Sequence, residues 1–187
     1  MIDFLSKMPV DFINGVTPPV SSIIIFCANL FGILAITTAL VFIVLHPMHI
    51  KSTKNILSLF RARVEEIFIL CFSTAGAYVI SVLAKNYFKV ARPFVLDTSI
   101  VNLIPESGYA FPSSHATVFM ALGVALFFMH KRIGAVFIFG ALIIGVARVL
   151  SGVHTPLQVL AGYILGFVFA LITAYIFRFI DGRKRKV

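Results

Sequence analysis

Long apolar runs separated by short polar segments are the dominant pattern of this chain. Five of these runs approach the roughly 20 residues that a helix needs to cross ~30 Å of hydrocarbon. Open strands would leave backbone groups unpaired in lipid, so we expect every run to be helical. The third run is the shortest and needs its flanking residues to reach both membrane interfaces. The predicted spans cover residues 20–45, 67–84, 116–130, 133–150 and 157–177.

Residues 1–19 follow a different pattern. Three charged residues, Asp3, Lys7 and Asp11, interrupt an otherwise mostly apolar segment. This mixture is typical of an amphipathic helix that lies in the membrane interface. The sequence has no internal repeat and no linker, which indicates a single domain. We expect that domain to consist of an interfacial segment (1–19), a transmembrane bundle (20–179) and a basic cytoplasmic tail (180–187).

The composition supports the membrane interpretation. Of the 187 residues, 60% are hydrophobic and only 12% are charged, whereas an ordinary soluble domain has about 25% charged residues. A soluble fold of this size could not bury so much apolar surface, so the predicted class is an all-α integral membrane bundle of five helices. Cys27 and Cys71 lie inside predicted spans, and we interpret both as small core hydrophobes without a disulfide or a metal.

The positive charges predict an orientation. Of the 16 Lys and Arg residues, eleven fall on one side of a five-span bundle. The positive-inside rule makes that side, with the C-terminus, cytoplasmic. The net charge of +9 is therefore a topology signal in a cell-membrane protein, and it argues against nucleic-acid binding. The eleven cations are Lys51, Lys54, Arg61, Arg63, Lys131, Arg132, Arg178, Arg183, Lys184, Arg185 and Lys186.

Cations on the opposite face point to an anion. Apart from Lys7, they are Lys85, Lys89, Arg92 and Arg148, all at the ends of predicted spans. The positive-inside rule disfavours cations there, so their presence suggests that they bind a negatively charged group. The alternative is that they are snorkelling anchors, which we favour for Lys89 alone.

The first of three polar segments on this face ends in Arg92-Pro93. Lys85 precedes Arg92 by seven residues, close to two helical turns, so the two side chains can share a face if the helix continues. Pro93 disfavours helix at the preceding residue and turns the chain away. A planar guanidinium and a mobile ammonium both suit phosphate oxygens.

The second segment contains Ser113, Ser114 and His115 just before an apolar run. The serine pair predicts a helix start, where free N–H groups and the positive dipole end can hold an anion. His115 falls in the first turn, where it is either a plain polar cap or a functional group.

The third segment runs from Arg148, at the end of the fourth span, to Gln158. Ser151-Gly152 is expected to turn the chain, and Thr155-Pro156 fits a helix start. His154 would then project on the same side as Arg148, with Gln158 one turn deeper on the same face.

Two histidines and three cations therefore converge at one interface without a carboxylate cluster. A metal site would need more carboxylate or imidazole ligands, so we predict no metal and no cofactor. The set fits phosphoryl transfer, in which one imidazole attacks phosphorus, the other handles the proton of the leaving group, and the cations hold the equatorial oxygens.

These segments resemble the three motifs of the membrane branch of the type 2 phosphatidic acid phosphatase superfamily, K-x6-R-P, P-S-G-H and S-R-x5-H-x3-D. The motifs occur in family order, and the resemblance extends from about residue 67 to the end of the chain. Three positions depart from the pattern: Ser114 replaces Gly, Ala147 replaces Ser and Gln158 replaces Asp. The matching residues are Lys85, Arg92, Pro93, Pro112, Ser113, His115, Arg148 and His154.

The resemblance implies a metal-independent phosphatase whose site faces away from the cytoplasm. His154 would be the nucleophile that forms a phosphohistidine. His115 would protonate the leaving oxygen and then activate the water that releases phosphate. The phosphate-binding groups would be Lys85, Arg92, Arg148, Ser113 and the backbone N–H of Ser114.

Gln158 stands where the family has an Asp that accepts a hydrogen bond from the nucleophilic histidine. The amide oxygen of Gln158 can still accept that bond, but it carries no charge. Three hypotheses follow: the enzyme is slow but active, Asp97 or Glu106 supplies the missing carboxylate, or the chain is a lipid-binding relative with little activity.

The resemblance offers several substrates, namely undecaprenyl diphosphate, phosphatidylglycerol phosphate, phosphatidic acid and lipid A phosphate. We expect undecaprenyl diphosphate, because the chain is small and its site faces outward. A transporter is disfavoured because the ionisable residues lie at span ends and not at mid-span. A phosphotransferase that uses the same phosphohistidine stays open. The expected partners are the substrate lipid and membrane lipids, and the sequence does not reveal the oligomeric state.

Overall fold

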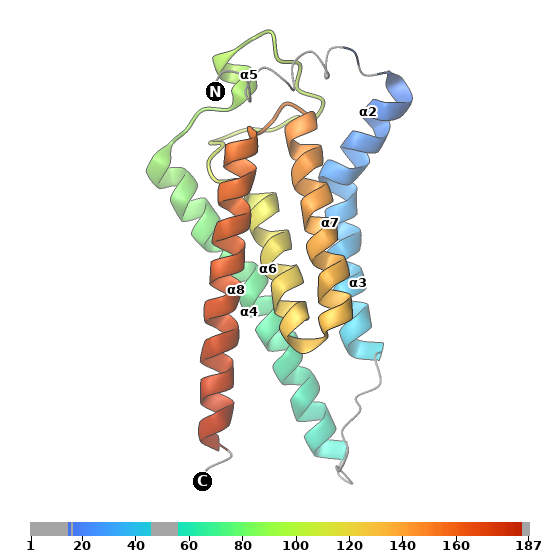
Figure 1. The fold of residues 1–187 in the computed structure, drawn as a ribbon, viewed down its shortest axis with the longest axis vertical. Helices are drawn as coiled ribbons and strands as arrows, with labels where there is room; N and C mark the ends of the chain where they lie inside the picture. Colours follow the sequence, from blue (N-terminus) through green and yellow to red (C-terminus); the bar gives the residue numbers. More distant parts are fainter. Residues whose placement is uncertain (1–14, 16, 46–55, 185–187) are drawn as a thin grey trace.

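The computed structural model describes residues 15, 17–45 and 56–184. Every regular element in these ranges is helical, which confirms the predicted all-α class (Figure 1). The amphipathic helix expected at 1–19 lies almost wholly outside the described residues, as do the last three residues of the expected tail, 185–187. The elements are α2 (Pro18–Ile25), η1 (Phe26–Leu30), α3 (Phe31–Leu45), α4 (Ile56–Phe88), α5 (Pro93–Leu96), α6 (Ser114–Met129), α7 (Lys131–Leu150) and α8 (Pro156–Lys184).

Four segments are long and apolar enough to cross a membrane, namely 18–45, 60–96, 131–150 and 156–177. The first combines α2, the π-helical turn η1 and α3 in one continuous rod. Large apolar side chains such as Ile33, Val146 and Ile164 are exposed on the outside of the bundle, as expected for lipid-facing residues. The last helix, α8, continues five residues beyond the predicted end of the bundle at 179.

The third predicted span, α6, is the central helix of the bundle. Its 16 residues make it about 24 Å long at 1.5 Å per residue, which is less than the ~30 Å of hydrocarbon. Nearly all of its middle residues are buried, because α4, α7 and α8 pack around it. A helix enclosed by protein does not have to match the thickness of the lipid. Figure 1 shows its N-terminus recessed below the upper ends of α7 and α8.

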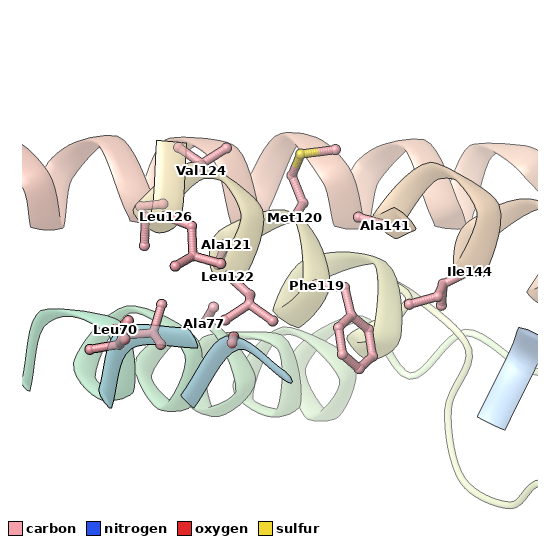
Figure 2. Packing of buried hydrophobic residues seen from close by; sticks show 14 residues of the cluster. Leu70, Ala77, Phe119, Met120, Ala121, Leu122, Val124, Leu126, Ala141 and Ile144 are labelled. Atoms are coloured by element: carbon pink, nitrogen blue, oxygen red, sulfur yellow. The ribbon is translucent and has the colours of Figure 1, made fainter. Parts of the chain in front are cut away.

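The core lies between α6 and the surrounding helices. Figure 2 shows Met120 and Val124 of α6 directed toward α8, whereas Phe119 and Leu122 point to the opposite side, where α3 and α4 lie. Leu122 is buried to 2% exposure. The side chains of α6 therefore join three helices to one core.

Two glycines allow α8 to approach α6 closely. Gly162 and Gly166 are four residues apart, as in the small-residue motifs of membrane helix pairs. A Cβ at Gly166 would lie 2.1 Å from the carbonyl oxygen of Thr117, and one at Gly162 would lie 2.6 Å from that of Ser113. This close approach brings the start of α8 against the N-terminus of α6.

Four of the cations assigned to the cytoplasmic side lie at one end of the bundle. Arg61 and Arg63 lie near the start of α4, and Lys131 and Arg132 begin α7, all at the end opposite the start of α6 (Figure 1). The structure therefore groups these four cations on one side of the bundle.

The prediction that both cysteines are core residues is wrong for Cys71. Both are free, but Cys71 is exposed on α4, whereas Cys27 is partly buried and packs against a cluster of buried hydrophobic residues. Apolar lipid receives a thiol as readily as a protein core does, so an apolar span does not tell the two surroundings apart.

Candidate active site

Lys85 lies in the last turn of α4, and Arg92 immediately precedes α5. The helix does not continue from Lys85 to Arg92, because α4 ends at Phe88 and Lys89 adopts a left-handed φ of 48°. The expected effect of Pro93 is observed, since Arg92 is extended and Pro93 starts the new helix. Both cations reach the same cavity even though the chain turns between them.

Arg92 is 5% exposed and is held mainly by backbone carbonyls. Its Nε donates to the oxygen of Gly108 at 3.2 Å, its Nη1 to that of Val153 at 3.3 Å, and its Nη2 to that of Ser107 at 2.9 Å. The same Nη2 lies 3.0 Å from Oε2 of Glu106. Arg92 therefore fixes the loop that follows α5 against the turn that precedes α8.

A buried hydroxyl at the N-terminus of α6 has no hydrogen-bond partner among the described residues. It is the Oγ of Ser113, the N-cap residue, which is in an extended conformation. Its N–H donates to the carbonyl of Gln158 at 3.0 Å, and the Oγ of Ser114 lies 3.0 Å from that of Ser81. His115 follows in the first turn and lines the cavity, while Ser113 occupies the cap position.

Arg148 lies in the last turn of α7 and is 1% exposed. Its Nη1 donates to Oδ1 of Asn29 at 3.2 Å, and its Nη2 forms a charge-assisted hydrogen bond with Oε1 of Glu106. Burial tends to raise the pKa of Glu106, but the hydrogen bond from Arg148 and the charges of Arg148, Arg92 and His115 outweigh it and hold that pKa below its usual value. Glu106 is therefore an ionised bridge between two arginines.

His154 lies in the short turn between α7 and α8 and is 3% exposed. Its Nδ1 is 3.2 Å from Oε1 of Gln158, and that oxygen also accepts the N–H of Thr155 at 3.0 Å. An atom that accepts a backbone N–H must be the amide oxygen, so Nδ1 of His154 carries the proton. The lone pair is then on Nε2. Gln158 thus fixes the tautomer that a histidine nucleophile needs.

The turn that carries His154 depends on Gly152, which has a φ of 76°. A Cβ at this position would also lie 2.7 Å from the carbonyl oxygen of Val101. Burial lowers the pKa of His154 well below its usual value, and the charges of Arg148, Lys85 and Arg92 act in the same direction. The hydrogen bond with Gln158 opposes this shift only in part. The imidazole is therefore neutral at physiological pH.

A cavity of about 410 Å³ joins these groups. A second, mainly apolar hollow of about 260 Å³ shares Tyr78, Ser114 and His115 with it and extends along the surface of α3 and α6. The first cavity can hold an anion, and the second can hold an apolar chain attached to it. The site side chains that line the first cavity are Lys85, Arg92, Glu106, Ser114, His115, Arg148 and His154.

Of the predicted site residues, Ser113 and Gln158 do not line this cavity. Ser113 caps α6, and Gln158 binds Nδ1 of His154. Of the two carboxylates considered as substitutes for the missing Asp, Glu106 reaches the site but binds the arginines. Asp97 lies in an exposed turn, where it accepts hydrogen bonds from the N–H and Oγ of Ser99. Neither carboxylate contacts Nδ1 of His154, because Gln158 occupies that position.

Asn29 is a site residue that the motifs did not reveal. It belongs to the π-helical turn and reaches Arg148 over a separation of 119 residues. A single Asn inside an otherwise apolar span is costly in lipid, and this cost is the signal that could have marked it. In the described ranges, no group of three or more His, Cys, Asp or Glu side chains could hold a metal ion.

The helices define a multi-pass membrane protein, and comparison with known proteins supplies the family. The model of the PAP2 superfamily matches residues 66–181, more than half of the chain. This chain therefore belongs to the PAP2 superfamily, and the match contains the whole of the site except Asn29.

Part of the chain is similar to several curated proteins. Bacitracin transport permease protein BcrC of Bacillus licheniformis is 38% identical over 48% of this chain and 42% of its own length. Undecaprenyl-diphosphatase BcrC of Bacillus subtilis is 32% identical over 57% and 53%. Lipid A 1-phosphatase of Rhizobium etli is 32% identical over 68% and 60%. The chain thus spans about half the length of the curated relatives it matches.

Two solved structures share the fold. LpxE of Aquifex aeolicus has a TM-score of 0.67 and 23% identity, over 89% of this chain and 92% of that one. A transmembrane PAP2-type phosphatidylglycerolphosphate phosphatase of Bacillus subtilis has a TM-score of 0.62 and 18% identity, over 100% and 87%. At these identities the likeness concerns the fold alone.

Proposed function

We propose that this protein hydrolyses a lipid phosphate or diphosphate at the extracytoplasmic face of the cell membrane, through a phosphohistidine and without a metal. Undecaprenyl diphosphate is the substrate we favour, because two relatives that carry that activity in their names are each 32% identical, over 57% and 52% of this chain. The observation that carries the proposal is the hydrogen bond between His154 and Gln158. It leaves a neutral imidazole with its lone pair on Nε2, in a cavity lined by three cations.

In the first step, Nε2 of His154 attacks phosphorus and the bond from phosphorus to the leaving oxygen breaks. His115 gives a proton to that oxygen, so the lipid leaves as an alcohol or a monophosphate. In the second step, His115 takes a proton from water, the water oxygen bonds to phosphorus, and the phosphorus–nitrogen bond breaks. Lys85, Arg92 and Arg148 are placed to stabilise the equatorial oxygens in both steps.

The adjoining apolar hollow supports a lipid substrate. It begins at Tyr78, Ser114 and His115, beside the proposed reaction centre, and continues between exposed apolar residues such as Ile33. A head group in the polar cavity could therefore keep its chain in the bilayer. Eleven of the 16 Lys and Arg residues fall on the side opposite the site in the predicted topology, and the positive-inside rule then favours an outward orientation of the site.

A lipid A 1-phosphate is the second candidate substrate, because a relative of that name matches over 68% of the chain. Both substrates present a terminal phosphate at the membrane surface, so they differ in the lipid that must leave. A phosphotransferase would use the same phosphohistidine with an alcohol as the acceptor.

The test is phosphate release by the purified protein in detergent with EDTA present. The substrates are undecaprenyl diphosphate, lipid A, phosphatidylglycerol phosphate and phosphatidic acid, and His154→Ala is the control. We expect release that resists EDTA, is fastest with undecaprenyl diphosphate and disappears in the control. Loss of activity with EDTA, or equal activity in His154→Ala, would refute the mechanism. Added glycerol that diverts phosphate from water would identify a transferase.

A further inference from the structure

Glu106 binds the two arginines that would hold the phosphate of the substrate. Its Oε1 binds Nη2 of Arg148 and its Oε2 lies 3.0 Å from Nη2 of Arg92, so one carboxylate joins the two guanidinium groups of the proposed anion site. Phosphate presents pairs of oxygens to guanidinium groups in the same manner. We infer that Glu106 is a specificity-determining residue, which occupies the anion site until a phosphate with more than one negative charge displaces it. This inference rests on the proposed phosphate site.

The two arginines do not depend on Glu106 for their positions. Arg92 has three backbone carbonyls as further partners, and Arg148 is bound to Asn29 at 3.2 Å. The guanidinium groups therefore stay in place when the carboxylate leaves. A residue needed only to orient them would be redundant with these partners.

Glu106 is also placed to move. Its side chain is 22% exposed, compared with 5% and 1% for its two partners, and it lines the cavity. It belongs to the irregular segment between α5 and α6, and Gly108, two residues later, has a left-handed φ of 70°. The carboxylate can therefore swing into the open part of the cavity without disturbing a helix.

The exchange of anions selects by charge. A phosphodiester carries one negative charge, so replacing the carboxylate with it brings no net charge to Lys85, Arg92 and Arg148. A phosphomonoester or a diphosphate brings at least one more charge, which gains attraction in a poorly solvated cavity. Most bilayer lipids are phosphodiesters and far outnumber any lipid with a terminal phosphate. The carboxylate of Glu106 would compete with these phosphodiester lipids for the arginines and so keep them out of the site.

The experiment measures binding and not turnover. Purified protein in detergent is heated with methyl phosphate, a phosphomonoester, or with dimethyl phosphate, a phosphodiester, about two units above the second phosphate pKa of ~6. Because a ligand that binds only the folded state raises the unfolding temperature, dose series give apparent affinities. The variants are wild type, Glu106→Gln and Asp97→Asn, which removes the same charge from the same segment without touching the arginines.

We expect wild type and Asp97→Asn to be stabilised by methyl phosphate and not by dimethyl phosphate. Glu106→Gln should unfold at a lower temperature without ligand, because two buried cations lose their carboxylate. It should bind both esters, with an affinity for methyl phosphate about tenfold higher than that of wild type.

Three outcomes would overturn the inference. They are equal binding of the two esters to wild type, no binding of either ester to wild type, and weaker binding of both to Glu106→Gln, which would make Glu106 a positioning residue. The first two need no variant, so the test survives if Glu106→Gln does not fold. Selective binding by a protein that releases no phosphate would keep the inference and reject the proposed hydrolysis.

Discussion

The Nδ1 atom of His154 lies 3.2 Å from Oε1 of Gln158, an oxygen that the N–H of Thr155 also binds at 3.0 Å. The backbone contact holds the amide in one orientation, so Gln158 can only accept from the imidazole. The resemblance to the family places a carboxylate at this position. Gln158 preserves the orientation and the tautomer of the histidine but offers no negative charge to a phosphorylated, positively charged ring.

This relationship predicts opposite effects for two substitutions. Gln158→Leu removes the acceptor and leaves the tautomer of His154 unfixed. We therefore expect kcat to fall by about 10²- to 10⁴-fold, the upper value being that of a histidine in the wrong tautomer in a serine-protease triad. Gln158→Asp restores the charge and should keep or raise kcat. Steady-state phosphate release measures both. A large loss with Asp would show that Gln158 has another role.

His115 should act mainly on the release of the phosphoenzyme when the substrate is a diphosphate. A lipid monophosphate leaves readily, so the first step needs little proton transfer, whereas the attacking water still needs a base. In His115→Gln, we therefore expect turnover to fall by about 10²- to 10⁴-fold while labelled phosphohistidine accumulates. Rapid quenching with a terminally labelled substrate and alkaline gel electrophoresis measures the label.

The control for this experiment is His154→Ala, which should carry no label at any time. Label that persists in His154→Ala would assign the nucleophile to another residue. An unlabelled His115→Gln with the same slow turnover would place its role in the first step instead.

The apolar hollow predicts a matched pair of variants. Ile33 lies in the hollow beside the site and is 62% exposed, and Ile164 lies on a different hollow along α8 and is 57% exposed. Because tryptophan would narrow the hollow, Ile33→Trp should raise KM for undecaprenyl diphosphate several-fold, and Ile164→Trp should not. Farnesyl diphosphate, with a much shorter chain, should be affected less. An equal effect of both variants would place the lipid chain elsewhere.

Local sequence signals were sufficient where neighbours along the chain decide the geometry. Pro93, Ser113 and Pro156 mark helix boundaries that the structure reproduces. The i to i+4 spacing predicts that Gln158 lies beside His154, and the two side chains do interact. The site elements that sequence did not predict depend on distant segments. Glu106 reaches Arg148 across 42 residues, and no spacing rule tells whether a loop carboxylate will bind an arginine or a histidine.

The short helix α6 shows a second limit of prediction from the sequence. Its length is visible in the sequence, but a hydrophobic run does not reveal whether lipid or protein surrounds it. The prediction that it stretches to both interfaces followed from treating all spans alike. Its enclosure by α4, α7 and α8 explains how Ser113 and His115 can lie below the outer ends of the neighbouring helices.

The close contact between α6 and α8 should be intolerant of added volume. In Gly166→Ala, the new methyl group would lie 2.1 Å from the carbonyl oxygen of Thr117, so the two helices must separate. We expect a loss of about 1–3 kcal/mol in the free energy of unfolding, together with lower activity because His154 moves away from the start of α6. Unfolding by SDS in mixed micelles measures the stability.

Gly140→Ala is the matched control, because its nearest neighbour is a ring carbon of Phe31 at 3.3 Å and a side chain can adjust. Its stability should change little, helped by the better helix propensity of Ala. A Gly166→Ala variant as stable as Gly140→Ala would contradict the proposed packing of α8.

The lowered pKa of His154 predicts how stability depends on pH. In the unfolded chain this residue takes up a proton below about pH 6.5, whereas burial and the charges of Arg148, Lys85 and Arg92 keep it neutral in the folded protein to a much lower pH. The unfolded state thus binds more protons in this window, and stability falls as pH decreases from about 6.5 toward the folded pKa. One such group contributes a slope of about 1.4 kcal/mol per pH unit.

His154→Asn removes this contribution and leaves Glu106 and the other charges in place. The free energy of unfolding, measured in mixed micelles at several pH values, should therefore fall less steeply in acid for His154→Asn than for wild type, by roughly 1 kcal/mol per pH unit. Parallel curves would mean that His154 has the same pKa in the folded and the unfolded protein, which would contradict the lowered pKa.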